Sequence, residues 1–442
     1  MSAHAYTLIL SIIFVVCIFS ACDNSTDANG HNDKLSSITN SSSSRDYPDS
    51  FKPDDTEYPY AGIPRIVIET EYRKKIKDRE TEIPAKMQIW GDSTNESEIM
   101  NLTIRGRGNT SWFEMAKKGY KIEFEEKQSI LGMPKDKDWA LIANYADKTL
   151  IRNYIAYRLS ATLNAYYAPR CEFAELYLNG EYLGVYLITE TIKVAKGRVD
   201  IPKDDNSYIV EFDAKYKENE QIIFSDVITN NGNGKSFRVH DPKDANNSVL
   251  DTLLVHIQNF ENFLKGIKAK EKNDINNWID IDESTKHYWV QEFAKNPDGK
   301  FYTSVYFSWV KGGKIKMGPI WDFDLAFGNH THKDFNLTEK WHIRNYWNQY
   351  LFKDTLYEQS ILKKWKENHR LFEAVLDSVE KISKKIKPAA QNNFKRWDIL
   401  GVSKNWLRKP YDSYEDAVTD LKEWISNRIK WIDSQSKSSD DK

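Results

Sequence analysis

The chain has 442 residues, of which 40% are hydrophobic and 29% are charged, a composition typical of a globular protein. Its formal net charge of −2 excludes the broad, sequence-independent nucleic-acid binding of strongly basic proteins. The length allows one large domain or two ordinary ones, and the 14 Trp and 24 Tyr can fill a core or form surfaces that stack on sugars.

The chain begins with an apolar run of the kind that directs a protein to export. The run ends in Ser20 and Ala21 directly before Cys22, a pattern typical of a bacterial lipoprotein signal. We therefore expect cleavage of residues 1–21 and acylation of Cys22, with the protein lipid-anchored to a bacterial membrane of the cell envelope, on its periplasmic side or at the cell surface. The alternative is an uncleaved membrane helix, because the run is near the shortest length that spans a bilayer.

A polar segment follows the expected anchor. Residues 22–58 are rich in Ser, Asn and Asp and contain few apolar side chains, so they predict a flexible tether. Cys17 and Cys22 lie in or at the end of the apolar run, which leaves Cys171 as the single cysteine of the folded body. We expect no disulfide within that body, and we interpret Cys171 as a core residue.

The first part of the expected domain, residues 59–190, is predicted to be a mostly antiparallel sheet with one principal helix. Two apolar segments around Asn179-Gly180 predict a β-hairpin, because this dipeptide is typical of two-residue turns. Apolar residues at helical spacing predict a helix over 147–163, with Asp147 as its N-cap. Further strands are predicted over 63–70, 83–91, 101–109 and 118–126.

The second part of the domain, residues 191–435, is predicted to be mainly helical. Its last helix begins with a capping-box-like pair, Ser413 and Asp416. A turn that contains Asp298 should separate the second helix from a β-hairpin. The acidic, Ser-rich residues 436–442 are expected to be frayed. The helices are expected over 248–267, 284–294 and 413–433, and the strands over 301–310 and 314–320.

Two carboxylates stand in the apolar stretch GPIWDFDLAFGN that follows the last of these strands. In an extended segment residues two apart point the same way, so Asp322 and Asp324 should project together while Trp321 and Phe323 pack on the other face. Neighbouring desolvated carboxylates repel unless a cation lies between them, and such oxygen ligands suit Mg²⁺. The alternative, in which both aspartates cap the next turn, stays open.

Asp298 adds to this pattern. The predicted elements here follow the order of a phosphoryl-transfer site in kinases: a helix, an aspartate in a loop, a β-hairpin and an aspartate at a strand end. Taken alone, Pro-Asp-Gly is a common turn. Upstream, the segment RGRGNTSW contains a Gly-x-Gly, and Lys118 and Lys121 on the next strand are candidates to contact phosphate. Exposed strand lysines are common, so an ordinary surface role for each is the alternative.

Together these motifs resemble the CotH (spore-coat protein H) family of atypical, kinase-like proteins. The matching stretches include RGRGNTSW, KKGYKIEF, YAPRCEFAELYLNGEYLGVYLITE and MGPIWDFDLAFGN, which run in the family's order from about Arg105 to Asn329. The resemblance implies an α+β fold of the atypical protein-kinase type with two lobes. The β-rich N-lobe would span about 59–190 and the mainly helical C-lobe about 191–435, with a nucleotide between them.

The same resemblance implies a reaction. Relatives transfer the γ-phosphoryl group of ATP, with Mg²⁺, to serines of coat proteins, so we expect an envelope or surface protein with a Ser or Thr acceptor as the partner. By position, Asp298 resembles the catalytic-loop aspartate, and Asp322 and Asp324 resemble the metal-binding ones. The candidates for binding the nucleotide are Lys118, Lys121 and Glu190.

Two departures from the kinase pattern define the alternative function. The helix over 147–163 contains no glutamate to pair with a lysine, and Thr303 or Ser304 stands where many relatives carry a metal-binding Asn. The alternative is therefore a catalytically weak or inactive kinase-like surface module that binds a glycan or a protein. Mg²⁺-dependent nucleotide binding would distinguish the kinase from this module.

Overall fold

The computed structural model shows an α+β protein, as the sequence predicts. It describes residues 46–91, 96–217, 219–230, 232–330, 332–407 and 409–440. The expected signal segment, the lipidation site Cys22 and residues 22–45 of the expected tether lie outside the described residues.

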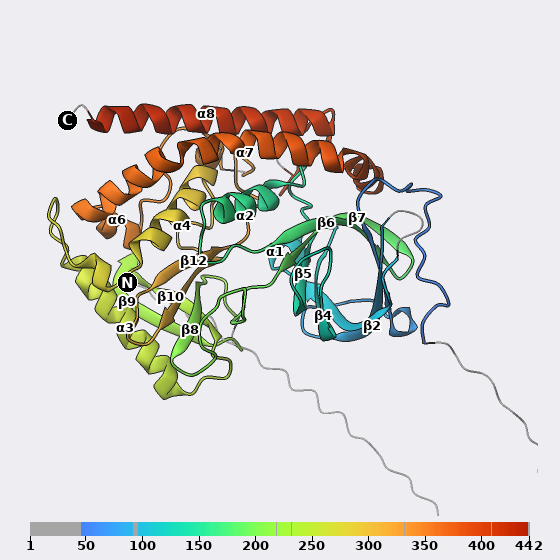
Figure 1. The fold of residues 1–442 in the computed structure, drawn as a ribbon, viewed down its shortest axis with the longest axis horizontal. Helices are drawn as coiled ribbons and strands as arrows, with labels where there is room; N and C mark the ends of the chain where they lie inside the picture. The colour runs from blue at the N-terminus through green and yellow to red at the C-terminus, as the bar shows by residue number, and fades with distance from the viewer. Residues whose placement is uncertain are drawn as a thin grey trace, which may run out of the picture. The chain divides into compact units, whose positions relative to one another are not determined.

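A closed barrel of seven strands forms the first part of the described chain (Figure 1). The strand order around it is β1-β2-β3-β4-β5-β7-β6, and a parallel pairing of β1 with β6 closes it. The other neighbours pair in antiparallel fashion. The strands are β1 (Arg65–Thr70), β2 (Ile83–Trp90), β3 (Met100–Arg107), β4 (Gly119–Gln128), β5 (Asp136–Ile142), β6 (Cys171–Leu178) and β7 (Glu181–Glu190), with η1 (Glu71–Arg73) and α1 (Thr110–Phe113) in the connections.

The predicted hairpin at Asn179-Gly180 is confirmed as the turn between β6 and β7. Both turn residues have positive φ, 53° and 80°, as this kind of two-residue turn requires. The parallel pairing of β1 with β6 does not follow from the sequence patterns, because it joins segments far apart in the chain. The barrel therefore contains a closure that the expected antiparallel sheet lacks.

A five-stranded sheet with helices forms the second part, so this region is less purely helical than predicted. The strand order is β12-β11-β8-β10-β9. The predicted hairpin of β11 and β12 is confirmed, whereas β8 is a fully buried run, which lacks the alternation that marks a half-exposed strand. The elements are β8 (Ser207–Phe212), β9 (Ile222–Asn230), β10 (Asn233–Asp241), β11 (Val305–Val310), β12 (Lys316–Ile320), α2 (Arg152–Thr162), α3 (Asn247–Lys265), η2 (Ile275–Asn277), α4 (Ile281–Ala294), α5 (Lys333–Asn336) and α6 (Trp347–Leu351).

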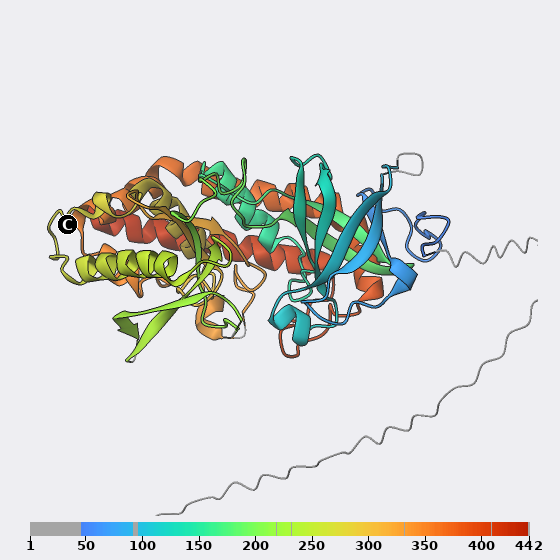
Figure 2. The same ribbon diagram turned by 90° about the horizontal axis from the view of Figure 1, so that it is seen from below.

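Two long helices, α7 (Thr355–Arg396) and α8 (Tyr414–Asp440), run along both parts of the molecule (Figures 1 and 2). Near the end of α7, Asn393 Oδ1 accepts hydrogen bonds from the backbone N of Val185 at 3.1 Å and from Lys117 Nζ at 2.9 Å. Gly184 permits this approach, because a Cβ there would lie 2.4 Å from Asn393 Oδ1. Helix α7 thus attaches the barrel to the helical part.

The two predicted helix starts have different outcomes. Helix α2 begins at Arg152, five residues later than predicted, because the Asp147 carboxylate accepts hydrogen bonds from the backbone N of Thr149 and of Arg152, each at 2.9 Å. Asp147 therefore stabilises a turn ahead of the helix instead of serving as its N-cap. In α8 the predicted pair is confirmed: the backbone N of Asp416 donates to Ser413 Oγ at 3.1 Å.

The ends of the described chain are more ordered than the sequence suggests. Residues 46–58, expected to be the end of a flexible tether, pack on the barrel, where Phe51 is 5% exposed and Asp55 pairs with Arg65. Helix α8 continues to Asp440, past the point at which we expected fraying. Among the residues that the structure describes, no helix is both long and apolar enough to cross a bilayer.

A buried histidine makes the stability of this fold dependent on pH. His287 in α4 is 8% exposed, and burial lowers its pKa to about 4. Since the folded pKa lies below the unfolded value of about 6.5, its contribution is complete above that pH and is lost as the pH falls toward 4. Between pH 7 and pH 5 this costs about 2 kcal/mol of unfolding free energy. In urea unfolding, we expect the drop in unfolding free energy between pH 7 and pH 5 to be about 2 kcal/mol smaller in His287→Gln than in wild type.

The half-exposed His332 supplies the control for this measurement, because its side chain is 59% exposed. His332→Gln should leave the difference between pH 7 and pH 5 as in wild type. An unchanged acid dependence in His287→Gln would contradict the assignment.

Candidate functional site

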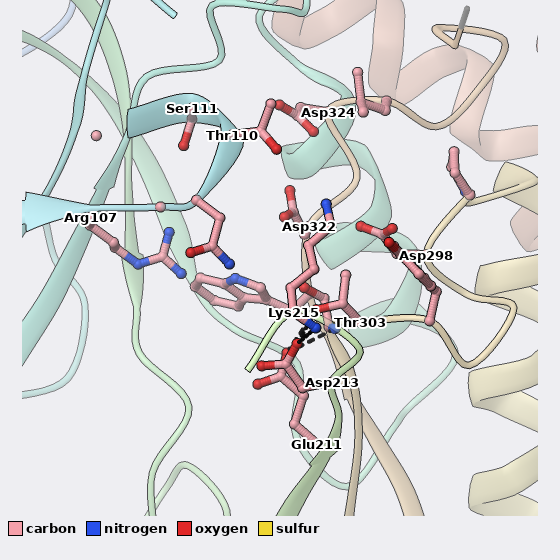
Figure 3. Close-up of a pocket in the computed structure, with 18 of the residues that line it drawn as sticks. Arg107, Thr110, Ser111, Glu211, Asp213, Lys215, Asp298, Thr303, Asp322 and Asp324 are labelled. Carbon is pink, nitrogen blue, oxygen red and sulfur yellow. Dashed lines mark hydrogen bonds between the residues drawn. The ribbon is translucent and has the colours of Figure 1, made fainter. Parts of the chain in front are cut away.

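A cleft of about 830 Å³ lies between the barrel and the five-stranded sheet. The barrel contributes the end of β3 and the following loop, and the second part contributes the ends of β8 and β12 and the loop after α4. The labelled side chains in Figure 3 point into it from these elements. They are Arg107, Thr110, Ser111, Glu211, Asp213, Lys215, Asp298, Thr303, Asp322 and Asp324.

Asp298 lies in a turn directly after α4. The helix ends at Ala294, and the left-handed conformation of the capping residue Lys295 redirects the chain toward the cleft. Asn296 then holds the turn: its Nδ2 donates to Gln291 Oε1 at 3.0 Å and to the backbone O of Asp322 at 3.2 Å. This second hydrogen bond links the turn of Asp298 to the segment of Asp322. Desolvation and the nearby charge of Asp322 raise the pKa of Asp298 to about 8.

Asp322 and Asp324 follow the end of β12, and both line the cleft. The backbone is not an extended strand, since Asp322 has φ 64°. Between the aspartates, Phe323 is fully buried, and its backbone N donates to Asn153 Oδ1 at 2.7 Å. The predicted division is therefore only partly present: Phe323 is turned into the core, whereas Trp321, predicted to pack on the same face as Phe323, lines the cleft with the carboxylates because a local turn replaces the extended strand.

The surroundings of these two carboxyl groups disfavour their charged forms. The side chain of Asp322 is exposed only toward the cleft, and the enclosing walls desolvate it and raise its pKa. For Asp324, desolvation first and then the charge of Asp322 raise the pKa well above the usual range. The two carboxyl groups lie within hydrogen-bonding reach of each other. A cation between them would remove this repulsion.

Lys215 is a cleft residue that the sequence analysis missed. Its side chain extends from the segment after β8 toward Asp322 and Asp298, and its charge favours the ionised form of both (Figure 3). The ammonium nitrogen also lies 5.5 Å from the centre of the Tyr302 ring. Recognising β8 as a buried strand would have marked its polar end, Glu211 to Lys215, as a candidate site.

Beneath Lys215, a second pair of carboxylates is fully engaged by hydrogen bonds. Thr303 Oγ1 donates to Asp213 Oδ1 at 3.1 Å, and the backbone N of Ser304 donates to Glu211 Oε1 at 2.8 Å (Figure 3). Desolvation raises the pKa of Asp213. Burial is the largest single influence and would raise the pKa of Glu211, but the hydrogen bond and charge of His240, the charge of Arg238 and the hydrogen bond from the backbone N of Ser304 together outweigh it, so the pKa is lowered. The Thr303 hydroxyl thus already donates its hydrogen bond to a protein carboxylate.

The barrel side of the cleft is formed by the segment RGRGNTSW. Arg107 lies over the ring of Trp321, 4.8 Å from its centre, and presents its guanidinium toward the acidic wall (Figure 3). Gly108 follows with φ 100°, and a Cβ there would lie 2.0 Å from Ser111 Oγ, so the tight loop requires glycine. Thr110 and Ser111 line the cleft beyond this turn.

The other predicted nucleotide-binding residues lie elsewhere. Of the described residues that line the cleft, none is Lys118, Lys121 or Glu190. Lys118 Nζ donates to the backbone O of Trp112, and Lys121 Nζ pairs with two carboxylates on the barrel, each at 2.8 Å. Glu190 is buried and pairs with Arg170 at 2.6 Å. The structure does not bring these three side chains to the aspartates, and their contact with a nucleotide stays a prediction.

The donor set in the cleft fits a hard cation that keeps open positions. Within the described part of the chain, no three His, Cys, Asp or Glu side chains form a ready cage for a metal ion. Mg²⁺ is commonly held by one or two carboxylates, with waters and substrate phosphates completing its shell. Asp322 and Asp324, two adjacent carboxyl groups whose charged forms disfavour each other, match that requirement.

Comparison with known proteins supports the resemblance drawn from the sequence. The family model described as CotH kinase protein matches residues 104–432, well over half of the chain. The inner spore coat protein H of Bacillus subtilis (strain 168) is 22% identical over 372 residues, which cover 82% of this chain and 92% of the relative. The matched region contains both walls of the cleft and all three of its predicted aspartates. The chain therefore belongs to the CotH kinase family.

Proposed function

We propose that this protein is an atypical Ser/Thr protein kinase that transfers the γ-phosphoryl group of ATP, with Mg²⁺, to a protein. The observation that carries the proposal is the meeting of Asp298, Asp322 and Asp324 in one cleft with Lys215 extending between them. Carboxylates that repel one another in a desolvated site cost stability, so their presence favours a role with a cation and an anionic substrate. Family membership points to the same chemistry.

Each side chain has a role in this reaction. The acceptor oxygen bonds to the γ-phosphorus as the bond from that phosphorus to the bridging oxygen breaks, and ADP leaves. Asp298 orients the acceptor hydroxyl and takes its proton. Lys215 and Arg107 neutralise the phosphate oxygens from opposite sides of the cleft. Asp322 and Asp324 would hold Mg²⁺, which supplies further charge neutralisation on the phosphates when bound.

The architecture supports a two-lobed, kinase-like arrangement. The β-rich barrel lies on one side of the cleft, the sheet and helices lie on the other, and β7 ends at Glu190, where the expected boundary between the lobes lies. The loop after β3 faces the aspartates from the barrel side, as a phosphate-covering loop of a kinase would. These features are the basis for assigning the nucleotide to this cleft.

We propose a location at the cell envelope or on a coat layer. The relative from Bacillus subtilis is named as an inner spore coat protein. The apolar run that ends before Cys22 favours a lipid anchor there, with an envelope or surface protein as the substrate. Metabolic labelling with a palmitate analogue tests the anchor, because Cys22→Ala should abolish incorporation.

Nucleotide binding tests the metal site directly. A ligand at about 100 times its dissociation constant adds about 2.7 kcal/mol to the unfolding free energy, so Mg²⁺ with ATP should raise the melting temperature of the full chain. Asp322→Asn should lose most of this shift, because one of the two adjacent carboxylates is gone. Differential scanning calorimetry with and without chelator measures both.

Asp251→Asn is the matched control, since Asp251 is exposed on α3 and does not line the cleft. It should keep the full shift. A full Mg²⁺-dependent shift of the melting temperature in Asp322→Asn would show that the Asp322 carboxylate is not a metal ligand. Absence of any nucleotide effect in wild type would contradict the proposed kinase.

A second candidate, a kinase-like module that binds a protein or glycan without turnover, is favoured by one observation. Thr303 or Ser304 stands where many relatives carry a metal-binding Asn, and the Thr303 hydroxyl is turned toward Asp213, to which it donates. Helix α2 likewise contains no glutamate, and its buried Arg152 pairs with Asp147. Binding of a partner without any response to Mg²⁺ and ATP is the result that this second function requires.

A further inference from the structure

Three exposed aromatic side chains lie near the cleft, and one of them, Tyr302, lines it. Tyr216, Phe224 and Tyr302 are 40%, 54% and 44% exposed. Tyr216 and Phe224 meet edge to face, with ring centres 5.5 Å apart. The backbone N of Ala214 donates to the backbone O of Tyr302 at 2.9 Å, which brings Tyr302 beside the segment that carries Tyr216. We name Tyr216, Phe224 and Tyr302 the aromatic rim.

The aromatic rim is continuous with the proposed transfer site. Tyr302 lines the cleft, and its backbone N donates to the backbone O of Asp298 at 3.1 Å. A hydroxyl that reaches Asp298 therefore belongs to a molecule that passes beside the rim. Exposed apolar side chains grouped at one place mark a binding surface more often than isolated ones do.

Two lysines lie next to the chain segment that carries Tyr302 and lack carboxylate partners among the described residues. Lys235 and Lys300 both line the cleft. Lys235 Nζ donates to the backbone O of Phe301 at 2.9 Å, and Lys300 Nζ lies 5.2 Å from the centre of the Phe335 ring. Neither lysine forms an ion pair within the described residues. A ligand that carries an anionic group would supply the missing partner for both.

We propose that the aromatic rim together with Lys235 and Lys300 binds the acceptor as an extended protein segment. That segment carries an apolar side chain for the rim and an anionic group, carboxylate or phosphate, near the accepting Ser or Thr. The inference rests on the proposed kinase function. A protein segment fits better than a glycan, because sugars stack on flat ring faces, whereas the ring planes of Tyr216 and Phe224 meet at 77°.

Fluorescence anisotropy with labelled peptides tests the proposal on the full chain. The reference probe is a ten-residue peptide with one Ser, two adjacent Glu and one Phe. We expect it to bind about tenfold more tightly than versions with Glu→Lys or Phe→Ser. A version with phosphoserine in place of Glu identifies the anion, and tighter binding by either anionic peptide than by the Lys version supports the proposal.

Variants of the protein locate the binding. Tyr216→Ser with Phe224→Ser should weaken binding of the reference peptide about tenfold, and Tyr72→Ser should not, because Tyr72 is 64% exposed but lies in η1 of the barrel and is no member of the aromatic rim. Lys235→Glu should reverse the preference between the Glu and Lys peptides. Lys314→Glu is its control, since Lys314 bonds to Asn276 away from the cleft. Unchanged binding in both the rim variant and Lys235→Glu would overturn the inference.

The same preparations separate this inference from the kinase proposal. Tight binding of a soluble β-glucan or maltoheptaose that the rim variant loses, without peptide binding, would overturn the inference in favour of a glycan. If Mg²⁺ and ATP fail to stabilise the chain but peptide binding keeps its charge dependence, the kinase proposal fails and the surface remains a peptide-binding site. If ATP stabilises the chain and no peptide preference exists, the inference alone fails.

Discussion

Replacing Asp298 with Asn is expected to reduce phosphoryl transfer by a factor of about 10²–10⁴. Asn keeps the size of the side chain but cannot take the proton of the acceptor hydroxyl. Binding of ATP should change little, because Asp322 and Asp324 are the proposed metal ligands. The rate is measured as transfer of labelled phosphate from ATP to a serine-containing protein or peptide, and binding is measured as the Mg²⁺-dependent rise in melting temperature.

The two readouts together test the role of Asp298. Loss of transfer with retained nucleotide stabilisation is the result that supports an acceptor-orienting aspartate. Equal loss of both would make Asp298 a metal ligand or a structural residue. Unaltered transfer would contradict the assignment of Asp298. Asp251→Asn, which changes an exposed aspartate on α3, should leave both quantities at the wild-type level.

The largest expected loss of stability comes from a buried ion pair that joins α4 to α8. Arg428 and Glu292 have fully buried side chains, with Arg428 Nη2 2.6 Å from Glu292 Oε1. Glu292 also accepts hydrogen bonds from the backbone N of His342 at 2.8 Å and of Ile343 at 2.6 Å. Arg428→Met would leave this carboxylate without its cation. We expect a loss of about 3–5 kcal/mol in unfolding free energy, measured by urea denaturation.

Two further variants make this measurement specific. Glu292→Gln combined with Arg428→Met should recover part of the loss, because the amide keeps an acceptor and removes the uncompensated charge. Lys430→Met, which changes an exposed cation on the same helix, should alter stability by less than about 0.5 kcal/mol. If Arg428→Met lowered the unfolding free energy by less than about 0.5 kcal/mol, water would have to reach the ion pair.

Local patterns in the sequence predict the acidic half of the site. Asp298 stands in a turn that the end of α4 dictates, and Asp322 and Asp324 alternate with side chains that burial holds in place. Both features depend only on residues close together in the chain, so the local sequence is enough to predict them. The Asn179-Gly180 turn and the Ser413–Asp416 cap are predictable for the same reason.

The basic half of the site depends on contacts between distant segments. Lys215 reaches the aspartates because β8 pairs with β11, and Arg107 faces them because the barrel closes and packs on the second part. No local pattern distinguishes these cations from Lys118 or Lys121. Lys121 instead pairs with Asp138 on the neighbouring strand, at 2.8 Å, a contact that only the strand register reveals.

The attachment of α7 to the barrel has a consequence for how the cleft admits its ligands. The chain crosses between the barrel and the second part before and after α2 and again after β7, and α7 also holds the barrel, through Asn393 and through a hydrogen bond from Trp397 Nε1 to the backbone O of Leu183 at 3.0 Å. Attachments at several places disfavour rotation about a single hinge. We therefore expect the distance between the walls to change little, with substrates and products passing by movements of side chains and short loops at the mouth.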